Sequence, residues 1–177
     1  FDGTYIWTAN YENDSVSKLR ASDGALIGTY PVGDGTYPFG DGPMGLAFDG
    51  TYIWTANNLG DTVSKLQASD GALIGTYRLG EYPQYGNNYR PMGLVFDGTY
   101  IWTSNWNGSK GVSKLQASDG AIIGNYQVNF PTGDRAISLV FDGTYIWTAN
   151  TDSMSKVRAS DGTQIGNYPV ADTHVNR

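Results

Sequence analysis

Few residues of this chain have the type and spacing that catalysis requires. The sequence contains one histidine, His174, and no cysteine, which excludes thiolate nucleophiles, disulfides and cysteine-ligated metals. A Ser–His–Asp arrangement would need this terminal segment to reach a hydroxyl elsewhere. The carboxylate pairs Glu12/Asp14 and Asp34/Asp41 could serve acid–base chemistry or bind Ca²⁺, but neither pair has the spacing of a defined motif. We therefore expect no catalytic residue, metal site or cofactor, and Ca²⁺ binding is an option that no motif supports.

A second kind of chemistry, the binding of a polar ligand, has more candidates. Aromatic rings can stack on sugar rings or peptide groups, and Asn and Arg side chains can bind hydroxyl groups. The same residue types are also ordinary in turns, where their rings hold linkers in place. The strongest candidates are Trp106 and the cluster of tyrosines between residues 82 and 89. The complete set of candidate ligand-binding residues is Tyr11, Tyr37, Tyr82, Tyr85, Tyr89, Arg90, Trp106, Asn107 and Arg135.

The composition restricts the class of protein. The 177 residues carry a net charge of −6 and no cluster of Lys or Arg, so we expect neither a nucleic-acid partner nor an anionic membrane surface. Aromatic residues reach 14% and charged residues only 16%, which excludes a disordered chain. No apolar run has the length of a membrane-spanning helix, and we expect no membrane insertion.

Four copies of one sequence unit account for the whole chain. The string FDGTYIWTAN begins at residues 1, 48 and 141, and its variant FDGTYIWTSN begins at residue 96. A second block, such as VSKLQASDGALIGTY from residue 63, follows each copy, and PMGLA, PMGLV and AISLV precede the last three copies. We interpret residues 1–177 as one domain of four units, over residues 1–43, 44–91, 92–135 and 136–177.

Each unit predicts four short strands and no helix. In the second unit the strands are expected at 44–48, 52–56, 63–68 and 72–77, with Asp-Gly between the first two and between the last two. Asp-Gly between β-formers is a strong hairpin signal, and four-stranded units at this period are typical of a β-propeller. The sequence therefore predicts an all-β fold, a propeller of four blades with four antiparallel strands each. The first strand of each blade should line the axis.

Two repeated side chains have simpler interpretations. The tryptophan of each FDGTYIW string is expected to pack between blades. The lysine of each VSKL or MSKV block is expected to be a solvated charge on an outer strand, which protects sheet edges from pairing. These lysines are Lys18, Lys65, Lys114 and Lys156.

The pattern of WTAN, TVSKL, IGTY and P-x-GLAFDG resembles the YVTN-type propeller repeats of bacteria and archaea, relatives of the NHL group. The resemblance implies a propeller, usually of six to eight blades, on an extracellular or cell-surface bacterial protein. Repeats of a similar type occur in virginiamycin B lyase-like propellers, whose chemistry relies on His and a divalent metal. With one terminal His here, no residue of that chemistry is carried over.

The repeat begins out of phase with a complete blade. The first unit starts after its expected inner strand, which leaves the edge near Tyr5 and Trp7 unpaired. We expect either a segment of a longer propeller or completion by another copy. Self-association or continuation in a longer chain is thus the expected partner relationship.

The two ends of each blade differ in variability. The DGT and ASDG turns of one end recur in every unit, whereas the loops of the other end differ. These variable loops are residues 10–15, 57–62, 105–111 and 150–153 between the second and third strands, and residues 33–43, 80–91, 129–135 and 171–177 after the fourth strand. Positions that diverge between near-identical copies are where specificity would lie. We expect a non-catalytic extracellular module that binds a carbohydrate or another polar ligand through these loops. The alternatives are a structural subunit of a surface layer or filament, and a lyase or hydrolase.

Overall fold

The computed structural model describes residues 1–36, 40–80, 89–107, 111–128 and 135–170. Apart from one short 3-10 helix, η1 (Tyr11–Asn13), all regular elements in these ranges are β-strands. The strands of the first and second sheets are β1 (Tyr5–Asn10), β2 (Ser15–Arg20), β3 (Leu26–Pro31), β4 (Pro43–Phe48), β5 (Tyr52–Asn57), β6 (Thr62–Gln67) and β7 (Leu73–Arg78). The strands of the third and fourth sheets are β8 (Pro91–Phe96), β9 (Tyr100–Asn105), β10 (Val112–Gln116), β11 (Ile122–Tyr126), β12 (Ala136–Phe141), β13 (Tyr145–Asn150), β14 (Ser153–Arg158) and β15 (Gln164–Pro169).

Each sheet is an antiparallel meander, in which strands that follow one another in sequence pair in space. Within the described residues, three sheets have four strands, and the first has three, β1 to β3. The all-β propeller architecture predicted from the repeat is confirmed, and β1 has no inner strand beside it in the first sheet, as expected. The structure has no helix long and apolar enough to cross a membrane within the residues that it describes.

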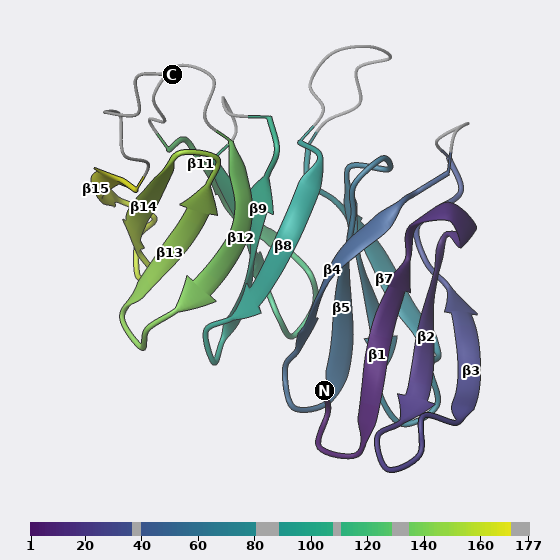
Figure 1. The fold of residues 1–177 in the computed structure, drawn as a ribbon. Coiled ribbons are helices and arrows are strands. Elements are labelled where there is room, and N and C mark those ends of the chain that lie inside the picture. Colours follow the sequence, from purple (N-terminus) through teal and green to yellow (C-terminus); the bar gives the residue numbers. More distant parts are fainter. Residues whose placement is uncertain (37–39, 81–88, 108–110, 129–134, 171–177) are drawn as a thin grey trace, which may run out of the picture.

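The inner strands β4, β8 and β12 pack side by side, and β1 lies against β4 (Figure 1). This close packing depends on glycine in the PMGL block. A Cβ atom on Gly45 would lie 2.2 Å from the carbonyl oxygen of Met92, and one on Gly93 would lie 2.9 Å from the Cα of Ser138. Because real Cβ atoms do not approach other atoms so closely, any other residue at Gly45 would push the inner strands apart.

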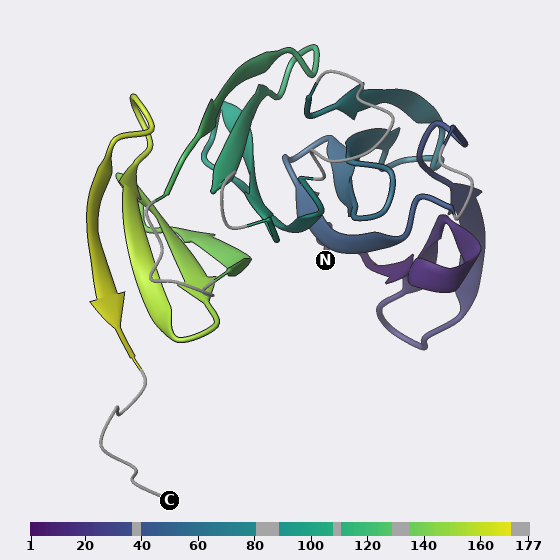
Figure 2. The ribbon, with the colours of Figure 1, turned by 90° about the horizontal axis from the view of Figure 1, so that it is seen from above.

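The four sheets follow one another along an open arc. In Figure 2 the first sheet, in purple, and the fourth sheet, in yellow-green, lie at opposite ends of this arc. Among the described residues no strand of the first sheet pairs with a strand of the fourth. The arrangement therefore leaves one face of each end sheet without a neighbouring sheet.

The hydrophobic core consists of three clusters, one at each junction between neighbouring sheets. A tryptophan from β1, β5 or β9 of the preceding sheet anchors each cluster. Trp7 is 7% exposed, and Trp54 and Trp102 are fully buried. Each of these rings also contacts a tyrosine of its own outer strand, at 5.7 Å between ring centroids for Trp7 and Tyr30. The prediction that the repeated tryptophans pack between blades is confirmed for these three.

The repeated lysines depart from the prediction of a solvated charge. Lys18, Lys65 and Lys114 are only 2–3% exposed. The ammonium of Lys18 donates to the carbonyl oxygens of Ala68 and Ser69, at 2.7 and 2.9 Å, in a turn of the next sheet. It also lies 4.1 Å from the centroid of the Tyr5 ring. The prediction was wrong because a turn of the following blade covers the strand that carries the lysine, and the ammonium donates hydrogen bonds to the carbonyl oxygens of this turn.

A tyrosine completes each junction. The ring of Tyr30 covers Gly71 in the turn of the next sheet, since a Cβ atom on Gly71 would lie 2.2 Å from that ring. Tyr77 covers Gly120 in the same way. The invariant ASDG turn is therefore a docking element, which receives one lysine and one tyrosine from the preceding sheet.

Candidate functional site

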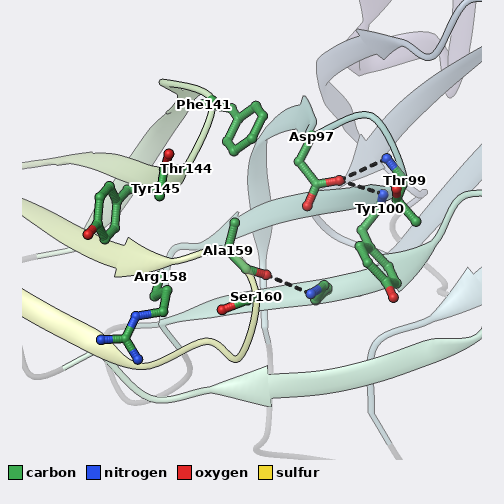
Figure 3. Close-up of a pocket in the computed structure, with 11 residues that line it drawn as sticks. Asp97, Thr99, Tyr100, Phe141, Thr144, Tyr145, Arg158, Ala159 and Ser160 are labelled. Carbon is green, nitrogen blue, oxygen red and sulfur yellow. Dashed lines mark hydrogen bonds between the residues drawn. The ribbon is translucent and has the colours of Figure 1, made fainter.

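A cavity of about 550 Å³ lies between the third and fourth sheets, at the end with the invariant turns. Figure 3 shows that the Asp97 carboxylate in this cavity accepts hydrogen bonds from the backbone N–H groups of Thr99 and Tyr100, at 2.9 and 2.7 Å. The Lys114 ammonium donates to the carbonyl oxygen of Ala159 at 2.7 Å. The charged groups at the centre of this cavity are therefore engaged in holding the fold.

The same cavity recurs at another junction. Its counterpart, of about 350 Å³, lies between the first and second sheets and contains the equivalent residues Asp2 and Lys18. A hollow that repeats with the sheets, and whose lining is nearly the same at both junctions, is a feature of the propeller junction. Specificity is therefore expected at the opposite end, where the loops differ.

A smaller cavity of about 270 Å³ opens at the variable-loop end, near the inner strands. The residues that line it come from the first three units, and they are Tyr11, Met44, Asn58, Arg90, Met92 and Trp106. We call this the loop-end pocket. The lining combines two aromatic rings, two thioethers, one amide and one guanidinium, a mixture suited to a ligand with both a flat apolar face and polar edges.

One repeat position supplies three sides of the loop-end pocket. Tyr11, Asn58 and Trp106 each directly follow the asparagine that ends the second strand of their unit. The fold places this position at the same end of every sheet, so three different side chains converge there. Met44 and Met92 are in turn the second residues of β4 and β8. The strands are therefore scaffold, and the residues at their ends determine what the pocket can contact.

Backbone hydrogen bonds fix these loops to the linkers between sheets. The N–H of Trp106 donates to the carbonyl oxygen of Arg90 at 2.9 Å, and the N–H of Asn58 donates to that of Gly42 at the same distance. Arg90 itself has a φ of 49°, a conformation that its N–H stabilises by donating to Oδ1 of Asp61 at 2.7 Å. Burial raises the pKa of Asp61. The segment that carries Arg90 is thus positioned by a carboxylate outside the pocket lining.

A second arginine lies beside the pocket. The guanidinium carbon of Arg135 is 4.8 Å from the ring centroid of Trp106, which is within the range of a cation–π interaction. Trp106 is half-buried, whereas Arg135 is exposed. Arg135 therefore braces one face of the indole ring and leaves the ring at the rim of the pocket.

The structure brings together only some of the nine predicted site residues. Tyr11, Arg90 and Trp106 line the pocket, Arg135 contacts Trp106, and Asn107 is half-buried beside Trp106 in the chain. Tyr37, Tyr82 and Tyr85 lie outside the described residues.

Tyr89 departs from the expectation of a ring that stacks on a ligand. It is only 8% exposed and belongs to the core cluster between the second and third sheets. Its hydroxyl accepts a hydrogen bond from the amide of Asn125 at 3.2 Å. Its ring also covers Gly80, where a Cβ atom would lie 2.4 Å from it. Tyr89 therefore belongs to the packing between the second and third sheets and not to the pocket lining.

Two of the acidic residues considered for catalysis or Ca²⁺, Asp14 and Asp34, have structural partners. Oδ1 of Asp14 accepts from the backbone N–H groups of Asp41 and Gly42, at 2.7 and 2.8 Å. Asp34 forms an ion pair with Arg78. Asp41 is 2% exposed, and its Oδ1 has no hydrogen-bond partner. No group of three His, Cys, Asp or Glu side chains that could hold a metal occurs within the ranges that the structure describes.

Three pocket residues, Met44, Met92 and Asn58, were not predicted from the sequence. The two methionines belong to the PMGL block, which looks like scaffold because it recurs. Asn58 stands at the same position in its unit as Tyr11 and Trp106, and that correspondence was the signal that would have found it. Alignment of the four units around the end of the second strand identifies this position without any structure.

Comparison with known proteins supports the fold. No family model matches the sequence, and no curated protein is significantly similar to it. Among solved structures, the hydrazine synthase of Kuenenia stuttgartiensis matches with a TM-score of 0.75 and 15% identity, over 96% of this chain and 47% of that one. A streptogramin B lyase structure matches with a TM-score of 0.74 and 18% identity, over 96% of this chain and 52% of the other. The fold is that of a β-propeller. The chain spans about half the length of these two structures, and identities this low show the fold alone.

Proposed function

We propose that this chain is a non-catalytic binding module, which takes a carbohydrate or a similar polar ligand in the loop-end pocket. The observation that carries the proposal is the convergence of Tyr11, Arg90 and Trp106, from three different units, on one cavity. Two of these residues occupy a repeat position that differs in all four units, while the surrounding strands scarcely differ. Divergence at a position that lines a shared cavity favours ligand recognition over packing.

The chemistry of the lining favours one class of carbohydrate. The indole of Trp106 and the ring of Tyr11 offer flat apolar surfaces, and Met44 and Met92 add adaptable ones. Arg90 supplies hydrogen-bond donors with a permanent positive charge. Since the described lining contains no carboxylate, this cation faces the pocket without an acidic neighbour in the lining. We therefore propose a sugar that carries a carboxylate or a comparable acceptor group.

Binding accounts for these residues better than the lyase alternative does. A streptogramin B lyase is among the similar structures, but the described residues that line the loop-end pocket supply stacking surfaces and hydrogen-bond donors, and none of them is a general base. The resemblance of the repeats to the YVTN and NHL type supports an extracellular bacterial location. We include that location in the proposal.

A glycan array followed by titration calorimetry tests the proposal. Trp106→Ala and Tyr11→Ala should each weaken binding at least about tenfold, because a buried stacking contact contributes roughly 1–3 kcal/mol. Ile74→Ala is the matched control, since Ile74 is 51% exposed on the outer strand β7, and it should bind like the unaltered protein. A hit on the array whose affinity is the same in all three variants would refute the loop-end pocket as the site.

A further inference from the structure

The junction between neighbouring sheets has two unlike halves. The preceding sheet provides a lysine and a tyrosine, which we call the donor half. The following sheet provides the turn carbonyls and the turn glycine, which we call the acceptor half. The contacts recur closely: the Lys65 ammonium donates to the carbonyl oxygens of Ala117 and Ser118 at 2.7 and 2.9 Å, the same distances as for Lys18. The junction is thus a defined and repeatable interface.

The fourth sheet carries a donor half that no described residue occupies. Lys156 lies 3.8 Å from the centroid of its own Tyr145 ring, the same placement as the other three lysines, yet it has no carbonyl acceptor within the described ranges. The ring centroid of Tyr168 lies 5.7 Å from that of Trp147, but Tyr168 is 45% exposed. Val170 is 60% exposed, whereas its counterpart Leu79 is 1% exposed. The side chains are therefore preorganised for a junction and remain open to solvent.

The first sheet carries the matching acceptor half. Gly24 has open space where a Cβ atom would stand, with no described atom within 4 Å, while its counterparts Gly71 and Gly120 are buried. Ile6 is 41% exposed, against 2% for its counterpart Ile53. The turn has the same backbone hydrogen bonds as in the other sheets: the Gly24 N–H donates to the Arg20 carbonyl at 2.8 Å, as Gly71 does to Gln67. This acceptor is preformed and uncovered.

We propose that the fourth sheet of one copy docks on the first sheet of a second copy of this chain, head to tail, through a fourth junction of the same kind. Lys156 would donate to the carbonyl oxygens of Ala21 and Ser22, and Tyr168 would cover Gly24. The two halves cannot meet within one copy in the arrangement of Figure 2, where they lie at opposite ends of the arc. A second copy supplies both halves at once, and it extends an interface that the chain already forms three times.

Such an interface is heterologous, because the two surfaces that meet are different. Each copy therefore has one donor half and one acceptor half, and association continues until a ring closes or a filament grows. Either product satisfies the proposal. Neither depends on the ligand proposed for the loop-end pocket.

Light scattering on the 177-residue chain tests the docking. We expect a mass of at least twice 19.1 kDa at micromolar concentration. Lys156→Glu damages the donor half, and Gly24→Asn places a side chain where Tyr168 would dock while tolerating the positive φ. Each variant alone should return to a single-copy mass. Arg158→Ala, at an exposed neighbour of Lys156 on β14, is the control and should associate normally.

Mixing the two damaged variants gives the decisive result. The intact acceptor half of Lys156→Glu and the intact donor half of Gly24→Asn can form one junction, so the mixture should contain a one-to-one pair that grows no further. Circular dichroism of each variant should match the unaltered chain, since both positions are at the surface. A single-copy mass for the unaltered chain would overturn the proposal. Association that survives both substitutions would do so too, because it would point to pairing along the free edge of β1 instead.

Discussion

The side-chain ammonium of Lys65 in the second sheet donates to the carbonyl oxygen of Ala117 in the third, across 2.7 Å. It also lies 4.0 Å from the centroid of the Tyr52 ring. Burial lowers the pKa of Lys65, so the folded protein bears a cost for keeping this charge inside. The carbonyl groups and the ring that surround the ammonium offset that cost. Cohesion between the blades therefore depends on a few polar contacts in addition to the apolar clusters.

Lys65→Met should destabilise the protein by about 2–3 kcal/mol, because charge-assisted hydrogen bonds contribute roughly 1.5–3 kcal/mol and the cation–π contact is lost as well. Lys156→Met is the matched control. It removes the same side chain from the fourth sheet, where no described carbonyl accepts a hydrogen bond from it. The loss of unfolding free energy should therefore stay below about 1 kcal/mol. Urea unfolding in dilute solution measures both. Equal losses would show that the lysine acts within its own sheet and not across the junction.

The turn glycines offer a second matched pair. Gly120→Ala should be destabilising by about 3 kcal/mol, since a Cβ atom there would lie 2.1 Å from the Tyr77 ring and overpacking adds to the strain of a positive φ. Gly24→Ala has the same strain, with a φ of 73°, but meets open space. It should therefore cost only about 1 kcal/mol. Thermal unfolding of both variants at low concentration measures the difference, and similar melting temperatures would contradict the contact between Tyr77 and Gly120.

The repeat predicts most of this fold, because hairpin turns and strand alternation are local properties. The repeat also predicts the packing of Trp54, because a large aromatic ring that recurs in the same strand of every unit is expected to be buried between blades. The burial of Lys65 could not be predicted in this way, since the carbonyl groups that accept its hydrogen bonds belong to the next unit, about fifty residues later. Sequence patterns within one unit do not show what the neighbouring unit places on top of it.

The candidate site shows the same limit. Tyr11 and Trp106 were recognisable because they are aromatic residues in variable loops. Tyr89 is also an aromatic residue in a variable loop, yet it is buried. The residues that cover it come from the second and third sheets, and the sequence of one loop does not show these contacts. Met92 was overlooked because it lies in a repeated block, although its place at the end of an inner strand exposes it to the pocket.

The buried carboxyl group of Asp41 predicts a dependence of stability on pH. Burial raises the pKa of Asp41 above its usual value of 3.8, so the folded state holds the proton more tightly than the unfolded state does. The contribution of this group to stability is therefore largest below the unfolded pKa and declines as the pH rises through the folded pKa. Asp41→Asn mimics the protonated form, and its amide oxygen can still accept from the Gly35 N–H, as Asp41 does at 3.2 Å.

Asp41→Asn should accordingly increase the free energy of unfolding at pH 7 by an amount on the order of 1 kcal/mol, and so raise the melting temperature. Near pH 4 the substitution should have little effect. Thermal unfolding of both proteins across this range gives the difference directly, and the other carboxyl groups cancel in the subtraction. A gain that is the same at both pH values would show that the carboxyl group of Asp41 is not the titrating group.

The position of Arg90 in the loop-end pocket predicts selectivity among sugars. A guanidinium that donates to a ligand carboxylate contributes roughly 1.5–3 kcal/mol, which corresponds to about a 10- to 100-fold difference in Kd. Arg90→Gln should therefore weaken binding of a uronic acid-containing oligosaccharide by at least about tenfold, and leave binding of its neutral counterpart within about twofold.

Arg20→Gln serves as the control, because Arg20 forms an exposed pair with Asp23 at the far end of the first sheet. Calorimetric titration of the three proteins at low and high salt should show that only the acidic ligand loses affinity with salt. Equal loss for the acidic and neutral sugars in Arg90→Gln would mean that Arg90 shapes the pocket instead of contacting the ligand's charge.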